Sequence, residues 1–295
     1  MLDLIFFDPL IYCALIIIPF FFVIVQYIPF RKFSAGTGIS ASYKNICRFE
    51  ESLSEHQLVS CVMVTRGDMD LIYASYSSFK SQSWKNCELV IVCDNVGDEL
   101  RSLADEDCGK IRLVEVQNGA FTLGDLRNLS VARARGEFIC QWDDDDLYDP
   151  DRISISMKVL IESSVEAVFL CRWLMWWEKR GLLSISPSRI WEGSLFARKS
   201  AISIYPSIAK GEDSVVTDWI TKYYSISLID YPQLYCYRVT GQNTWTINHF
   251  EQLFGNSSKA FKADEFITVF KLPCFQFAYL DKTGKQMSVP VTYSR

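Results

Sequence analysis

Four consecutive aspartates, Asp143–Asp146, follow directly after an apolar run and form the clearest chemical signal in the chain. Adjacent carboxylates raise one another's pKa unless a cation neutralises them. Carboxylate oxygens select hard cations, and Mg²⁺ commonly binds one or two carboxylates together with substrate phosphates. We therefore expect a metal–diphosphate site here, with Mn²⁺ or Mg²⁺ as the ion. The alternative is a solvated acidic turn in which an aspartate caps the helix that begins at Pro150.

Other polar residues stand where apolar runs end or helices begin. Thr65 follows the first apolar run of the folded part, and Asp94 follows the second. Glu212 and Asp213 open a stretch with helical spacing that reaches Tyr224. A carboxylate at a helix start can take a proton from a substrate hydroxyl, or it can simply cap the helix. Both interpretations stay open for Asp213, and a local side-chain turn is the alternative for Asp94.

The elements that must position these residues alternate between short apolar runs and helical stretches. Strands are expected at 58–65, 88–94, 111–116 and 137–142, and helices at 69–82 and 123–134. Apolar runs with little alternation, separated by helices, are typical of parallel strands covered on both faces. We therefore predict an α/β fold with an open, mostly parallel, Rossmann-like sheet and helices on both faces. Ligands bind beyond the carboxyl ends of such strands, where the acidic residues stand.

Several nucleotide- and cation-binding classes are excluded by what the loops lack. The first expected strand is not followed by Gly-x-Gly-x-x-Gly, and there is no Walker lysine loop. The aspartate run lacks the central Gly and terminal Glu of an EF-hand. A metal-dependent nucleotidyltransferase would use acidic strand ends too. It would also want a glycine-rich, basic loop after the first strand, and the loop at 65–68 is too short for one.

Three neighbouring segments then carry a resemblance to a known family. They are 123–128 (LGDLRN), 134–139 (ARGEFI) and 142–152 (WDDDDLYDPDR). Together they resemble the central signature of family 2 glycosyltransferases of the GT-A fold: an Arg-Asn helix, an Ala-x-Gly-Glu turn into a strand, a D-x-D motif, then Pro and Arg opening a helix. A broader resemblance covers about residues 58–250. It implies metal-dependent transfer of a sugar from a nucleotide-diphosphate donor, with inversion by direct displacement.

The resemblance also implies a role for each matching residue. Asp94 corresponds to the carboxylate that grips the nucleoside base, Asp143 to the first Asp of D-x-D, and Asp145 to the Asp that holds the metal. Asp213 corresponds to the general base, with Glu212 as its alternative. The other residues expected to bind the nucleotide sugar are Thr65, Asp125, Arg127, Asn128 and Asp144.

One family feature is missing from the chain. Relatives often carry a His near the positions of Val239 and Thr240 that can bind the metal. Either His249 replaces it, or carboxylates and phosphates hold the metal alone. Nearby tryptophans could stack on a sugar, or they could be core or membrane-proximal packing. These are Trp173, Trp176, Trp177 and Trp191.

Composition limits the class of protein further. Of the 295 residues, 49% are apolar and 22% charged, which suits a sizeable core and argues against disorder. The net charge of −5 lacks the basic excess of nucleic-acid binding, so no nucleic-acid partner is expected. The ten cysteines include no Cys-x-x-Cys pair. Because Cys61, Cys93, Cys140 and Cys171 lie in apolar runs, we predict reduced core cysteines and a reducing compartment.

The segment Leu10–Phe30 contains no charged side chain, and its 21 residues would span about 30 Å as a helix. Its acidic start and its length argue against a cleaved signal peptide. Arg31 and Lys32 follow it, which places the rest of the chain in the cytoplasm by the positive-inside tendency. A single-pass anchor in a bacterial inner membrane is expected. A buried hairpin or docked helix is the alternative.

The sequence thus predicts four parts and one main activity. The parts are a transmembrane anchor at 1–33, a linker at 34–57, a GT-A domain at 58–255 and a C-terminal extension at 256–295. The expected activity is hexosyl or N-acetylhexosaminyl transfer in polysaccharide biosynthesis. The donor would be a nucleotide sugar, a UDP-sugar first of all, and the acceptor a glycan or lipid-linked hydroxyl. A catalytically degenerate, membrane-associated scaffold and a metal-dependent nucleotidyltransferase are the alternatives.

Overall fold

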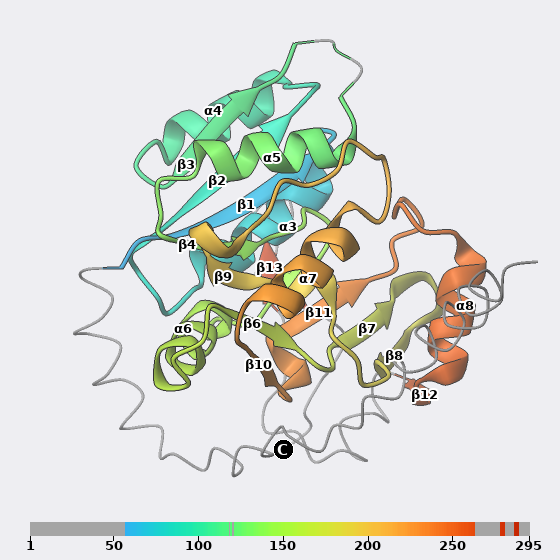
Figure 1. The fold of residues 1–295 in the computed structure, drawn as a ribbon. Helices are drawn as coiled ribbons and strands as arrows, with labels where there is room; N and C mark the ends of the chain where they lie inside the picture. The colour runs from blue at the N-terminus through green and yellow to red at the C-terminus, as the bar shows by residue number, and fades with distance from the viewer. Residues whose placement is uncertain (1–56, 118, 120, 263–277, 281–285, 289–295) are drawn as a thin grey trace, which may run out of the picture. The chain divides into compact units, whose positions relative to one another are not determined.

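The computed structural model describes residues 57–117, 119, 121–262, 278–280 and 286–288 (Figure 1). The expected anchor at Leu10–Phe30 and the expected linker up to residue 56 lie outside these residues. Within the described ranges, no helix combines the length and apolar character that crossing a bilayer requires.

A seven-stranded sheet forms the centre of the domain, in the order β10-β6-β9-β4-β1-β2-β3. All neighbouring strands run parallel except the two pairs that involve β9. The mostly parallel sheet predicted from the apolar runs is therefore confirmed. Its strands are β1 (Val59–Thr65), β2 (Cys87–Cys93), β3 (Ile111–Glu115), β4 (Phe138–Gln141), β6 (Ala167–Leu170), β9 (Phe196–Arg198) and β10 (Ile226–Ile229).

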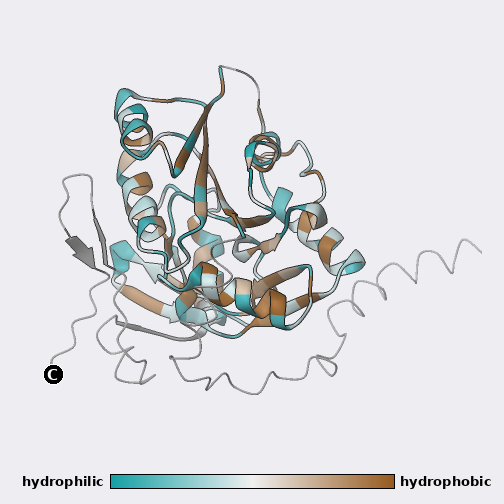
Figure 2. Ribbon diagram, turned by 90° about the vertical axis from the view of Figure 1, so that its left-hand side faces the viewer, coloured by the Kyte–Doolittle hydropathy of each residue, from teal (hydrophilic) through white to brown (hydrophobic). Residues whose placement is uncertain are grey.

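Helices pack on both faces of this sheet, as predicted, because successive side chains of a buried strand point to opposite sides. On β1, Cys61 and Met63 pack with α3 (Met69–Lys80), α4 (Asp98–Glu106) and α6 (Arg152–Glu162). Val62 faces the other way, toward α5 (Leu123–Arg133). On the face of the sheet that α5 covers, α7 (Glu212–Tyr223) packs on β6 and β9. Figure 2 shows apolar residues concentrated in the strands, between helices that also carry hydrophilic residues.

A second, five-stranded sheet was not predicted from the sequence. Its order is β12-β8-β7-β11-β5, and only the pair β11–β7 is parallel. β12 pairs with β8, so this part of the expected C-terminal extension is joined to the domain by a strand. The strands of this sheet are β5 (Leu147–Tyr148), β7 (Leu174–Trp177), β8 (Leu182–Ile185), β11 (Tyr235–Arg238) and β12 (Ser258–Lys262).

The remaining described elements lie outside the two sheets. They are α8 (Ile247–Asn256), the 3₁₀ turns η1 (Glu178–Arg180), η2 (Glu192–Ser194), η3 (Lys199–Ala201) and η4 (Pro232–Leu234), and the antiparallel pair β13 (Ala278–Leu280) and β14 (Gln286–Ser288).

The loop after β1 is shaped by a glycine and a helix cap. Gly67 has φ +87°, and a Cβ added there would lie 2.6 Å from the carbonyl oxygen of Asn95, in the loop after β2. Only glycine allows both that conformation and that approach. Asp68 then caps α3 by accepting a hydrogen bond from the backbone N–H of Asp70. Because of the close approach at Gly67, the loops after β1 and β2 lie in contact at the carboxyl edge of the sheet.

The cysteines of the described residues behave as predicted. Cys61, Cys93, Cys140 and Cys171 are buried with free thiols, and Cys108 is free and exposed. Buried free cysteines act as small apolar residues.

Candidate functional site

The carboxyl ends of β1, β2 and β4 open onto a cavity of about 740 Å³, which α5, α7, η2 and the segment 242–253 also line. Parallel strands bring their carboxyl ends to one edge, which is why residues distant in sequence meet there. Nine of the residues predicted for the site line this cavity. They are Thr65, Asp94, Arg127, Asp143, Asp144, Asp145, Glu212, Asp213 and His249.

We name Asp143–Asp146 the acidic turn, and its first two aspartates have different partners. The Oδ1 of Asp143 lies 3.0 Å from Nη2 of Arg127 in an ion pair. Asp144 accepts a hydrogen bond from the hydroxyl of Thr65, at the end of β1. Thr65 is buried, and its own Oγ1 accepts from the backbone N–H of Gly67. The end of β1 is therefore tied to the acidic turn by a side chain rather than by a strand pairing.

The last two aspartates of the turn divide between the cavity and the core. Asp145 lines the cavity, and its Oδ2 accepts a hydrogen bond of 2.7 Å from Nδ2 of Asn243. Asp146 is fully buried and accepts from the hydroxyl of Tyr235 and the backbone N–H of Arg238. The hydrogen bonds of Asp146 thus connect β11 to the acidic turn. Asp145 instead faces the cavity, and one of its carboxylate oxygens is hydrogen-bonded to the Asn243 amide.

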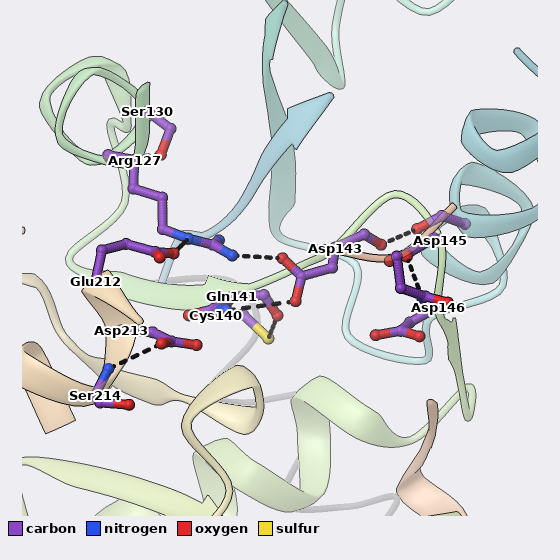
Figure 3. A network of polar contacts seen from close by, with 12 residues as sticks. Arg127, Ser130, Cys140, Gln141, Asp143, Asp145, Asp146, Glu212, Asp213 and Ser214 are labelled. Atoms are coloured by element: carbon purple, nitrogen blue, oxygen red, sulfur yellow. Dashed lines mark hydrogen bonds and ion pairs between the residues drawn. The ribbon is translucent and has the colours of Figure 1, made fainter. Parts of the chain in front are cut away.

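The carboxylates of the acidic turn lie close together, and Asp143, Asp145 and Asp146 are labelled in Figure 3. Burial raises the pKa of Asp145 to about 8, and the adjacent carboxylates of Asp144 and Asp143 add to the shift. Burial also raises the pKa of Asp144 to about 6. A divalent cation would stabilise the ionised forms, and carboxylate oxygens are the ligands that Mg²⁺ and Mn²⁺ prefer. The donor set at Asp145 therefore fits such an ion.

The three-ligand metal site expected from Asp145, Asp143 and His249 is not assembled. Across the described part of the chain, no group of three His, Cys, Asp or Glu side chains is arranged to hold a metal ion. The ring of His249 instead stacks on Trp245 with centroids 4.5 Å apart. Burial lowers the pKa of His249, and the cations Arg189 and Lys210 lower it further. The ring of His249 therefore forms part of the cavity wall, and Asp143 is already paired with Arg127.

Arg127 joins the acidic turn to the start of α7 (Figure 3). Its Nε lies 2.7 Å from Oε1 of Glu212, and its Nη2 reaches Asp143. Both Arg127 and Glu212 are buried. Burial by itself lowers the pKa of Arg127, but the carboxylates of Asp143 and Glu212 outweigh it and hold that pKa well above its ordinary value. Glu212 thus forms a buried ion pair, which does not suit the alternative role of general base predicted for it from the sequence.

Asp213 has the properties that a general base needs. It lines the cavity one residue beyond Glu212, and within the described residues its Oδ1 accepts a hydrogen bond from the adjacent backbone N–H of Ser214. Burial raises the pKa of Asp213 to about 6; the cation Arg127 opposes this shift, and Glu212 and other carboxylates reinforce it. A carboxylate with a pKa near the working pH is an efficient proton acceptor. N-capping does not account for Asp213, because Gly211 occupies the N-cap position of α7 and Asp213 is the second residue of the helix.

Two residues predicted to bind the nucleotide sugar have structural roles instead. Asp125 forms a capping box with Thr122 at the start of α5 and accepts a hydrogen bond from the hydroxyl of Ser207. Asn128 exchanges two hydrogen bonds of 2.8 Å with the backbone of Tyr205. Neither lines the cavity. Successive helical residues point about 100° apart, so of this group only Arg127 faces the site.

Four aromatic side chains of the cavity wall pack as one group, which we name the aromatic panel: Trp173, Trp191, Tyr235 and Tyr237. The ring of Trp173 stacks on each of the other three, with centroids 4.3, 4.8 and 5.2 Å away. Trp176 and Trp177 are buried in β7 and do not line the cavity, so for them core packing is the correct interpretation. Gly193 lies beside the panel, where an added Cβ would be 3.5 Å from Trp173 and from the hydroxyl of Tyr235.

Several cavity residues were not found from the sequence. They are Arg66, Phe121, Arg189, Glu192, Lys210, Asn243 and Trp245. Asn243 follows β11, a strand of the second sheet. Prediction of that sheet would have placed Asn243 in a loop after a strand, where site residues are expected. Lys210 Nζ lies 3.8 Å from the ring centre of Trp245, which joins the loop before α7 to the loop before α8. No sequence pattern announces that contact.

Comparison with known proteins covers the same region. Residues 60–175 match the sequence model described as Glycosyl transferase family 2. The putative glycosyltransferase EpsH of Bacillus subtilis (strain 168) is 30% identical over 100 residues, which are 33% of this chain and 28% of that protein. The structure of S. aureus TarS 1–349 in complex with UDP-GlcNAc is similar with a TM-score of 0.53 at 15% identity, over 67% of this chain and 64% of that one. TarS 1–349 in complex with UDP gives a TM-score of 0.53 at 16% identity, over 62% and 60%.

These matches are partial in length. The chain spans 28% of the curated relative and less than two thirds of each TarS fragment. The family match contains all three segments on which the sequence resemblance rests, 123–128, 134–139 and 142–152. At 15–16% identity the structural likeness concerns the fold, and it agrees with the fold predicted from the sequence.

Proposed function

We propose that the chain, whose residues 60–175 match glycosyl transferase family 2, belongs to that family and transfers a sugar from a nucleotide-diphosphate donor to an acceptor hydroxyl. The observation that carries the proposal is the convergence on one cavity of two sets of groups. The acidic turn with Asp145 forms one wall, and Asp213, a half-buried carboxylate without an ion pair in the described residues, stands on another.

The nucleotide would occupy the end of the cavity formed by β1 and β2. Thr65 and Asp94 line that end, and Asp94 would accept hydrogen bonds from the nucleoside base. The related TarS structures hold UDP and UDP-GlcNAc, which supports a UDP-sugar and an N-acetylhexosamine as the first candidates. A hydrogen-bonding carboxylate discriminates among bases because each base presents a different set of donors.

Mg²⁺ or Mn²⁺ would be held by Asp145 together with oxygens of the diphosphate. When bound, such an ion neutralises the charge of the leaving nucleotide diphosphate. Its fit rests on the hard oxygen donors at the acidic turn and on the raised pKa of Asp145, which burial and two neighbouring carboxylates produce. Asp143 would contribute through its place beside the ribose, held there by Arg127.

Asp213 would act on the acceptor. Its ionised carboxylate accepts the proton of the acceptor hydroxyl while that oxygen forms a bond to the anomeric carbon. The bond from the anomeric carbon to the diphosphate oxygen breaks, the electron pair leaves with the nucleotide diphosphate, and the configuration inverts. A positioned base contributes about 10²–10⁴ in rate. Arg127 and Glu212 hold the start of α7, and hence Asp213, against the acidic turn.

The acceptor and location remain part of the proposal. The uncharged segment Leu10–Phe30 supports a single-pass anchor with the catalytic domain on the cytoplasmic side of a bacterial inner membrane. A lipid-linked or growing-glycan acceptor in polysaccharide biosynthesis would suit that location. The test is transfer to lipid-linked against soluble sugars by the purified full chain. Equal use of both would contradict a membrane acceptor.

Calorimetric binding of UDP, GDP and TDP to the full chain, with and without Mn²⁺, tests the donor site. We expect one nucleotide to bind in a Mn²⁺-dependent manner and Asp145→Asn to abolish the dependence. Asp125→Asn is the matched control, because Asp125 lies in the same region of sequence but outside the cavity. Absence of binding by every nucleotide under both conditions would refute the transferase and favour the scaffold.

A further inference from the structure

Exposed large apolar side chains are concentrated around the cavity mouth and along α7. Nine such side chains are exposed within the described residues, and eight of them lie in α7, in the loop before it, or within two residues of a cavity-lining residue. Soluble surfaces carry exposed apolar residues singly, and a concentration of them marks an interaction site. The nine are Phe121, Ile204, Ile208, Val215, Trp219, Tyr223, Tyr231, Trp245 and Ile247.

Three of these residues form a stripe along α7, which we name the apolar stripe: Val215, Trp219 and Tyr223. They are spaced four residues apart, so they share one face of the helix. The rings of Trp219 and Tyr223 lie 4.2 Å apart. The opposite face of α7 is already buried on the sheet through Val216 and Ile220, so packing within the domain does not explain the stripe.

Four more of them surround the mouth of the cavity, and we name these the apolar rim: Phe121, Ile208, Trp245 and Ile247. Phe121 and Trp245 line the cavity itself. The carbonyl of Ile208 accepts a hydrogen bond from Gly124, three residues after Phe121, and Lys210 bridges to Trp245 by its cation–π contact. These two contacts connect the loops that carry the rim, and the apolar stripe begins beside the cavity, because Ser214 lines it next to Val215.

Two lysines of the kind found at membrane interfaces accompany this surface, and α7 also exposes Asp218. Lys210 and Lys222 place their ammonium groups over aromatic rings of the rim and the stripe, at 3.8 and 5.1 Å from the ring centres of Trp245 and Tyr223. Trp and Tyr prefer the level of the lipid headgroups, and lysines bind phosphate there. Trp and Tyr are common at protein–protein interfaces too, but Lys is depleted there, so the lysines favour lipid over a protein partner.

The chain outside the structure points to the same occupant. Between the uncharged segment that ends at Phe30 and the described residue Gln57 lie 26 residues, positions 31–56. Such a stretch reaches at most about 90 Å, at roughly 3.4 Å per residue. With the uncharged segment as the proposed anchor, a stretch of that reach would keep the domain near a bilayer without selecting which face meets it. The selection must come from the surface of the domain itself.

We propose that the apolar stripe and the apolar rim rest on the headgroup layer of a lipid bilayer, so that the cavity opens onto the membrane and admits a lipid-linked acceptor. The inference rests on the proposed function for the identity of the acceptor. The contact with lipid does not depend on it. Because Asp213 stands in the first turn of α7, a hydroxyl carried at the lipid surface would reach the proton acceptor without leaving the interface.

The tryptophans of the chain provide the assay. Of the eight, six are buried, and only Trp219 and Trp245 are exposed, at 42% and 43%. The full chain is reconstituted in vesicles of phosphatidylcholine with a minority of phosphatidylglycerol, with brominated or plain acyl chains. Brominated chains quench only indoles that reach the bilayer. We expect quenching of the wild type, a partial loss in Trp219→Phe and in Trp245→Phe, and its disappearance in the double variant.

Each outcome has a definite meaning when UDP binding is measured on the same preparations. No quenching of the wild type, or equal quenching of the double variant, overturns the proposal whether or not UDP binds. Quenching without binding of any nucleotide refutes the proposed function and leaves the lipid contact in place. As a functional arm, Trp219→Ser with Tyr223→Ser should retain UDP affinity, since neither residue lines the cavity, and should lower transfer to a lipid-linked acceptor more than to a soluble one.

Discussion

Replacing Arg127 by Gln would test whether the buried charge network holds the site together. The guanidinium bridges Asp143 and Glu212, and the side chains of Arg127 and Glu212 are only 9% and 3% exposed. Removing one partner of a buried ion pair strands the other charge, which costs about 3–5 kcal/mol. For a domain of this size, each kcal/mol lowers the unfolding midpoint by about 2–4 °C, so we expect a fall of about 6–20 °C.

The measurement is thermal unfolding of the full chain, followed by near-ultraviolet circular dichroism. Arg101→Gln is the matched control, because Arg101 makes an equally short ion pair with Glu115 in which both side chains are nearly half exposed. Its midpoint should hardly change, since solvent screens such a pair. The double variant Arg127→Gln with Glu212→Gln should recover part of the loss, because the stranded carboxylate is gone. A fall for Arg127→Gln no larger than that of the control would refute the reasoning.

Three further predictions concern the base, the sugar space and the backbone. Asp213→Asn should lower kcat by about 10²–10⁴ and leave the nucleotide Kd unchanged. Because burial raises the pKa of Asp213 to about 6 and the base acts when ionised, wild-type kcat/KM should fall as the pH drops below about 6. A flat profile there, or equal loss of nucleotide binding in the variant, would exclude Asp213 as the base. Gly193→Ala adds a methyl at van der Waals distance from the aromatic panel and 3.6 Å from Oδ2 of Asp143, so calorimetry should show a larger loss of UDP-sugar affinity than of UDP affinity; an equal effect on both ligands would contradict a sugar subsite there. Gly67→Ala should destabilise the fold by about 1–3 kcal/mol in denaturant unfolding, because φ is +87° and the Cβ meets a carbonyl oxygen at 2.6 Å, whereas Gly97→Ala, with nothing within 4 Å, should be neutral.

The local sequence was sufficient to predict the main elements and the acidic turn. Apolar runs with little alternation predicted β1, β2, β3 and β4 to within a few residues, because strands buried on both faces require apolar residues at every position. The acidic turn followed from the rule that ligands bind beyond the carboxyl ends of parallel strands. The second sheet was missed, because its strands are short and three of its pairings, β11 with β5, β11 with β7 and β12 with β8, join residues more than sixty positions apart.

Chemical roles within the site depended on the tertiary structure. Asp125, Arg127 and Asn128 look alike in sequence as polar residues of one helix, but helical rotation sends only Arg127 into the cavity. Glu212 and Asp213 are adjacent carboxylates, yet the first is paired with a residue 85 positions earlier and the second has no ion pair within the described residues. Sequence determined which groups are available at each strand end and helix start. Which of them are paired, and which face the cavity, depends on side chains from distant segments, and only the packed fold brings those together.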